Sequence, residues 1–77
     1  MVRAYVVVET DVGTSPELIE SIREMDGVET AHVIAGDWDV MVVFEVPEVY
    51  QVLSTTTTAI QALDGVLDTK TYVAIDE

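Results

Sequence analysis

Apolar residues occur along the chain in two kinds of pattern, runs typical of β-strands and the spacing of helical faces. Four runs rich in Val, Ile, Tyr and Phe have the composition of β-strands. These runs span residues 3–10, 28–35, 38–46 and 66–75. Before the second run and before the fourth, apolar residues recur at the spacing of one helical face. The residues that mark the two helices are Leu18, Ile19, Ile22 and Met25 for the first, and Val49, Val52, Leu53, Ile60 and Leu63 for the second.

The resulting order is βαββαβ, and its two halves repeat one another. Asp26-Gly27 and Asp64-Gly65 each end a predicted helix and are each followed by a valine that starts a strand. A duplicated βαβ unit with right-handed crossovers gives the ferredoxin-like βαββαβ sandwich, an α+β fold with the first and third strands in the centre. The segments "YVVV" and "VMVVF" are apolar on both faces, as central strands would be. We therefore predict a single domain over residues 1–77.

One face of this predicted sheet has no cover. Two helices protect one face of four strands, and side chains alternate between the faces of a strand. In the first strand, however, Tyr5 and Val7 are as apolar as Val6 and Val8. Because soluble proteins avoid a large bare apolar face, we expect a homodimer whose open sheet faces pack together, a dimeric α+β barrel.

Composition limits the classes of partner. The chain has 77 residues and no cysteine, so oligomerisation is the expected source of additional buried area. It carries 15 acidic and 3 basic residues, a net charge of -12, which argues against direct binding to nucleic acid. An acidic surface on a chain that is 49% hydrophobic favours a folded halophilic protein, with an ordinary acidic bacterial or archaeal protein as the alternative. Stability that is unchanged or lower in molar KCl than in dilute buffer would contradict the halophilic interpretation. No run is long enough to span a membrane and no signal peptide precedes the first strand, so a cytoplasmic location is expected.

Catalytic residue types are scarce. The single histidine, His32, lies in a predicted edge strand, where a structural role is more common than a catalytic one. There is no cysteine nucleophile and no glycine-rich phosphate loop. The sequence also offers no cofactor site and too few spaced oxygen ligands for a metal. We expect no enzyme, although a small oxidative or isomerising enzyme of the dimeric α+β barrel type stays open through His32.

The threonine-rich run "STTTTA", residues 54–59, lies inside the second predicted helix. β-Branched residues are poor helix formers, each a few tenths of a kcal/mol worse than alanine. We interpret the run as a solvated helical face, with a contact surface between subunits as the alternative.

The link between the second and third strands has an unusual composition. Glycine and aspartate are common in turns, which accounts for Gly36 and Asp37. A turn does not require the only tryptophan, Trp38, or a second acid, Asp39, at the start of an apolar strand. Two carboxylates beside an aromatic wall and backbone amides suit a small zwitterion, whose ammonium would meet the carboxylates. A plain hairpin turn is the alternative.

Together these features resemble the C-terminal effector-binding domain of the Lrp/AsnC family, the RAM domain. The features are the βαββαβ order, the Gly36-Asp37-Trp38-Asp39 turn and the pattern "DGV-x-x-T-x-T" that enters the last strand. The resemblance covers nearly the whole chain. It implies a sheet-mediated dimer that assembles further into rings, commonly octamers, and a small effector, an amino acid, that binds between dimers near the turn.

The resemblance also implies site residues and a partner. Carried over by position, Gly36, Asp37, Trp38 and Asp39 would form one side of the pocket, and Thr69 and Thr71 would contribute from the last strand. Family regulators carry a helix-turn-helix, for which 77 residues leave no room, so the resemblance is to a stand-alone form. Such a module could modulate full-length Lrp/AsnC transcription regulators. A purely structural assembly module is a further alternative.

Overall fold

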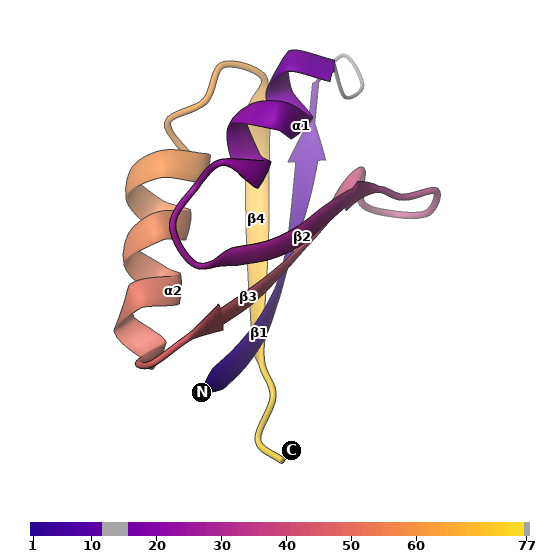
Figure 1. Cartoon of the computed structure of the whole chain (residues 1–77). Coiled ribbons are helices and arrows are strands. Elements are labelled where there is room, and N and C mark those ends of the chain that lie inside the picture. Colours follow the sequence, from indigo (N-terminus) through magenta and orange to yellow (C-terminus); the bar gives the residue numbers. More distant parts are fainter. Residues whose placement is uncertain (12–15, 77) are drawn as a thin grey trace.

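The protein folds as a four-stranded antiparallel sheet with its helices on one face (Figure 1). The structure is a computed structural model that describes residues 1–11 and 16–76. Its elements, in chain order, are β1 (Val2–Thr10), α1 (Pro16–Arg23), β2 (Val28–Val33), β3 (Val40–Val46), α2 (Val49–Thr55), the π-helix η1 (Thr56–Ile60) and β4 (Val66–Val73). The strand order is β2-β3-β1-β4, so the ferredoxin-like prediction is confirmed, with β1 and β3 in the centre.

The core lies between the sheet and the helices. From β1, Ala4, Val6 and Val8 are fully buried on the helix side. The register pairs them with residues of β3 that are equally buried, namely Phe44, Val42 and Val40. The helical layer completes the same cluster with Ile22 of α1, Val52 of α2 and Ile60 of η1. The alternation of the central strands therefore places one apolar set under the helices.

The second apolar set lies on the opposite, open face of the sheet. Tyr5 pairs with Val43 of β3 on one side and with Tyr72 of β4 on the other. Val7 pairs with Met41 and Lys70 in the same way, and these neighbours leave only 6% of Val7 exposed. Tyr72, by contrast, is 53% exposed. No helix of the described chain covers this face (Figure 1).

Two glycines end helical segments as predicted. Gly27 has φ +88° and Gly65 has φ +93°, both in the left-handed region that a Cβ disfavours. The space around them differs. A Cβ on Gly27 would lie 2.6 Å from Cγ1 of Val46, whereas a Cβ on Gly65 would lie 3.4 Å from Oδ1 of Asp11.

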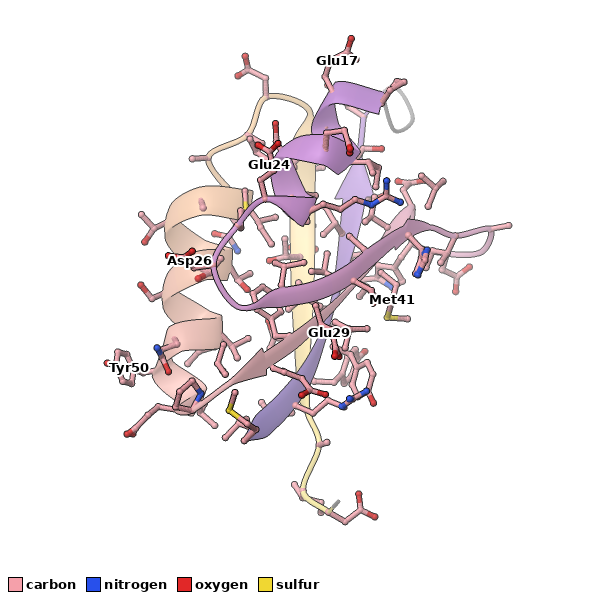
Figure 2. The ribbon with its side chains drawn as sticks, in the orientation of Figure 1. Glu17, Glu24, Asp26, Glu29, Met41 and Tyr50 are labelled. Carbon is pink, nitrogen blue, oxygen red and sulfur yellow. The ribbon has the colours of Figure 1, made fainter. Side chains whose placement is uncertain are left out.

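The second helical segment departs from the prediction. Val52 and Ile60 are buried as expected, but Val49 and Leu53 are exposed. The buried side chains form a row four residues apart, at positions 52, 56 and 60, and Val49 and Leu53 lie beside this row. The segment also changes from α2 to the π-helix η1, in which the N–H of Gln61 donates to the carbonyl of Thr56. Tyr50 projects from the other side of α2 into solvent (Figure 2).

Thr56 corrects our interpretation of the threonine run as a solvated face. Its side chain is 3% exposed, and Oγ1 has no hydrogen-bond partner within the described residues. A buried hydroxyl without a partner destabilises a fold by its lost hydration. Thr58 in the same π-helix is exposed. The run is thus divided between the core and the surface.

We expect Thr56→Val to stabilise the protein. Valine keeps the shape of threonine and removes the unsatisfied hydroxyl, so the free energy of unfolding should rise by about 1 kcal/mol. Thr58→Val is the matched control and should change it by less than about 0.5 kcal/mol, as is usual at the surface. Urea denaturation of both variants measures the difference. A destabilised Thr56→Val variant would contradict the placement of this side chain.

The acidic side chains of residues 1–11 and 16–76 lie outside the core, with Glu17, Glu24 and Asp26 pointing away from α1 and the segment after it (Figure 2). Among the described residues, no helix has the length and hydropathy needed to cross a membrane.

Candidate functional site

The turn between β2 and β3 lies at the end of the sheet where β1 finishes and β4 starts (Figure 1). It is longer than the two-residue link that the sequence suggested, because β2 ends at Val33 and β3 starts at Val40. Trp38 and Asp39, predicted as the first residues of the third strand, belong to this turn. Gly36 and Asp37 are exposed, and a Cβ on Gly36 would meet nothing within 4 Å.

Asp39 anchors the turn to the end of β1. Its backbone N–H donates to the carbonyl of Val8 over 2.9 Å, and its carbonyl accepts from the N–H of Ile34 over 2.9 Å. Its carboxylate oxygen Oδ2 accepts the N–H of Thr10 at 2.8 Å and the hydroxyl of Thr10 at 3.3 Å. Asp39 therefore has a structural task, which the sequence pattern did not reveal. Its other oxygen, Oδ1, makes no hydrogen bond to any residue that the structure describes.

Trp38 reaches from the turn to β4. The ammonium nitrogen of Lys70 lies 6.0 Å from the centroid of the Trp38 ring, at the outer limit of a cation–π contact. The indole is half-buried. Sequence reasoning missed Lys70 as a member of this cluster, because the two residues are 32 positions apart and meet only through the strand order.

Thr69 is brought to the same end of the sheet. It pairs with Val8, whose other neighbour is Val40 of β3. Its hydroxyl accepts from Nε2 of Gln61 at 2.7 Å, and its N–H donates to Oδ1 of Asp68 at 2.8 Å. Thr71, two residues further along the strand, pairs with Val6. The register places both threonines on the helix side of the sheet and Lys70, between them, on the open side.

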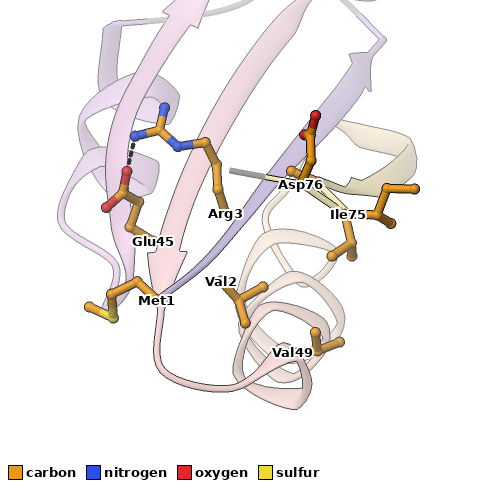
Figure 3. A pocket seen from close by; sticks show the side chains of 9 residues that line it. Met1, Val2, Arg3, Glu45, Val49, Ile75 and Asp76 are labelled. Carbon is orange, nitrogen blue, oxygen red and sulfur yellow. Dashed lines mark hydrogen bonds and ion pairs between the residues drawn. The ribbon is translucent and has the colours of Figure 1, made fainter.

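Two cavities lined by the described residues do not include the turn. One, of about 700 Å³, lies at the opposite end of the sheet, where Arg3 and Glu45 form an ion pair beside Val49 and Ile75 (Figure 3). The other, of about 230 Å³, lies at the start of β4, where Gln61 and Asp68, the hydrogen-bond partners of Thr69, both line it. On the single chain, Gly36 and Asp37 of the turn are exposed, and Trp38 and Asp39 are half-buried.

The residue considered for catalysis lies in an edge strand of the sheet. His32 is exposed in the edge strand β2, where it pairs with Met41. Across the described part of the chain, no three His, Asp or Glu side chains are close enough to share a metal ion.

Known proteins of the same fold include small single-domain proteins and a transcriptional regulator. The chain is similar in structure to FFRP-DM1, at 28% identity and a TM-score of 0.86 over 97% of this chain and all of that one. It is also similar to TTHA0845 from Thermus thermophilus, at 25% identity and a TM-score of 0.92 over 100% of this chain and 96% of that one. The fold is further shared by the transcriptional regulator NMB0573 from Neisseria meningitidis, solved as a complex with L-Met.

The similarity to the Neisseria regulator has 15% identity and a TM-score of 0.80, and it covers 99% of this chain but only 51% of the regulator. A search of curated protein sequences finds no match. The model of the Lrp/AsnC ligand binding domain matches residues 3–77, which is almost the entire chain. The chain therefore belongs to the Lrp/AsnC ligand-binding domain family.

Proposed function

We propose that this chain is a regulatory effector-binding module that senses a small amino acid at a boundary between subunits and so modulates transcription regulators of the Lrp/AsnC type. The single observation that carries the proposal is the cluster at one end of the sheet, where the turn of Asp37, Trp38 and Asp39 brings its tryptophan ring to 6.0 Å from the Lys70 ammonium, in a domain of this family. The cluster combines acidic oxygens, an aromatic wall and a cation, the three kinds of group that a zwitterion contacts.

Two observations support an amino acid as the effector: the negative net charge of the chain and the ligand of a regulator with the same fold. The ammonium of an amino acid suits a chain with a net charge of -12, and Oδ1 of Asp39 is available to accept from it. The Neisseria regulator of the same fold is described as an L-Met complex. Either argument alone leaves the effector open, and together they make L-methionine a reasonable first probe.

The open face of the sheet supports the proposal that the effector site lies at a boundary between subunits. Tyr5, Met41, Val43 and Tyr72 retain exposed apolar surface on that face, and the turn lies at its end. A second copy packed against the face would remove this surface from water and place its own residues near Trp38. An open turn on one chain would thereby become an enclosed site in the dimer or in a larger ring.

Two other functions compete with this one. A purely structural assembly module is favoured by the fact that neither cavity includes the turn residues. An enzyme of the dimeric α+β barrel type would need His32 inside a sheet-lined cavity, whereas His32 is exposed at an edge. We therefore prefer a non-catalytic role.

The test is a thermal-shift panel of the twenty protein L-amino acids at millimolar concentration, combined with sedimentation velocity. We expect at least one amino acid to raise the melting temperature of an oligomeric species. Assembly without any shift would favour the structural module, and a strictly monomeric species would remove the subunit boundary from the proposal.

A further inference from the structure

Lys70 differs from the other two basic residues of the chain. Arg3 forms ion pairs with Glu45 and with Glu29. Arg23 lies 3.9 Å from a carboxylate oxygen of Glu20 and donates to the carbonyl of Ala31 at 3.1 Å. Lys70 has no carboxylate partner among residues 1–11 and 16–76, and its neighbour there is the ring of Trp38. It is thus the one basic residue whose charge the described chain leaves uncompensated.

This charge matters because the chain as a whole carries a net charge of -12. Fifteen acidic residues face three basic ones, so a ligand carboxylate that approaches the protein is repelled over most of its surface. The turn adds Asp37 and Asp39, which suit an ammonium and disfavour a carboxylate. A site made of these acids alone would bind a simple amine better than an amino acid. Selectivity for a zwitterion requires a group that attracts the ligand carboxylate, and a positively charged side chain does so more strongly than a neutral N–H.

We propose that Lys70 anchors the carboxylate of the effector and thereby selects zwitterionic amino acids over amines. The inference rests on the proposed function and adds a residue and a selectivity rule to it. The ammonium lies 6.0 Å from the centroid of the Trp38 ring, and Asp37 and Asp39 flank Trp38 in the turn, so a positive and a negative group both neighbour the indole. A cation–π contact orients the lysine without neutralising it, which leaves its charge for a ligand.

The open sheet face strengthens the argument. Lys70 pairs with Val7, so its side chain emerges on the face that we propose to pack against a second copy. An ammonium that loses water in an interface needs an anion nearby, because desolvation of an unpaired charge is strongly unfavourable. The chain supplies none within its described residues. A ligand carboxylate meets this need, and a carboxylate of the second copy is the competing source.

The experiment compares Lys70→Gln, Lys70→Arg and the control Arg3→Gln, which makes the same change of charge at a paired arginine. The twenty L-amino acids are titrated first, and the tightest binder is then compared with its carboxamide, which lacks the carboxylate. For L-methionine the pair is L-methionine and L-methioninamide. The readouts are the dissociation constant from calorimetry and the oligomeric state from sedimentation velocity.

We expect Lys70→Gln to weaken amino-acid binding about tenfold or more, the loss of one charge-assisted contact. Binding of the carboxamide should stay unchanged or improve, Lys70→Arg should retain most of the affinity, and Arg3→Gln should bind normally. Equal loss for amino acid and carboxamide, or no loss at all, would overturn the role of Lys70 while leaving the proposed function intact. A Lys70→Gln variant that fails to assemble, with ligand affinity per dimer unchanged, would assign the counter-charge to the second copy instead. If no amino acid binds the unmodified protein, the proposed function fails, and this inference fails with it.

Discussion

Asp39→Asn is expected to remove the amino-acid response and to leave the fold intact. The asparagine carbonyl can still accept the N–H of Thr10, which Oδ2 of Asp39 accepts at 2.8 Å. The free energy of unfolding should therefore fall by less than about 1 kcal/mol. The negative charge that would meet the effector's ammonium is lost, so the thermal shift by the amino acid should disappear. Thermal melts with and without the amino acid measure both effects.

Asp39→Ala separates the two tasks of this carboxylate. Alanine leaves the N–H of Thr10 without its acceptor, and a hydrogen bond to a charged group contributes about 1.5–3 kcal/mol. This variant should lose both stability and the response. Thr10→Val is the control, because it removes only the longer contact of 3.3 Å and keeps the backbone donor. An Asp39→Asn variant with an unchanged amino-acid response would show that Asp39 is structural only.

Gly27→Ala is expected to cause the largest loss of stability among substitutions outside the core. The residue has φ +88°, and its Cβ would lie 2.6 Å from Cγ1 of Val46, which is itself buried. A left-handed alanine costs about 1–2 kcal/mol, and overpacking adds about 1–3 kcal/mol. The free energy of unfolding should fall by about 2–5 kcal/mol, as measured by urea denaturation.

Gly65→Ala is the matched control for this prediction. Its φ of +93° carries the same backbone strain, but its Cβ would meet Oδ1 of Asp11 at 3.4 Å, which is a looser contact with an exposed side chain. The loss should stay near the strain alone, about 1–2 kcal/mol. Equal losses at the two positions would mean that the approach of Val46 to Gly27 does not cost energy.

Much of the fold follows from local sequence signals. The apolar runs of β1 and β3 predict their central positions, because a central strand is shielded by a neighbouring strand along both edges and an edge strand is not. The Asp-Gly pairs predict the left-handed positions at Gly27 and Gly65, which the structure contains. The choice of Val49 and Leu53 for the core was wrong, because the buried row runs through Val52, Thr56 and Ile60, and a hydrophobic pattern does not select a threonine. The π-helix η1 was not predicted either, because helical spacing read from a sequence assumes about 3.6 residues per turn.

The site could be predicted only as far as it is local. The turn residues are adjacent in sequence, and their composition marked them as unusual. The hydrogen bonds between Asp39 and Thr10, by contrast, join residues 29 positions apart. The approach of Lys70 to Trp38 depends on β4 lying beside β1. Such contacts are fixed by strand order and register, so Lys70 could not be singled out from its neighbours in sequence.

We propose above all that the end of the sheet around Trp38 binds a small amino acid. Because Trp38 is the only tryptophan in the chain, intrinsic tryptophan fluorescence reports on this end of the sheet alone. We expect a saturable change in Trp38 emission when the folded, assembled protein is titrated with the twenty L-amino acids, and the same titration of Asp39→Asn should show none. Constant emission with all twenty at millimolar concentration would contradict the claim.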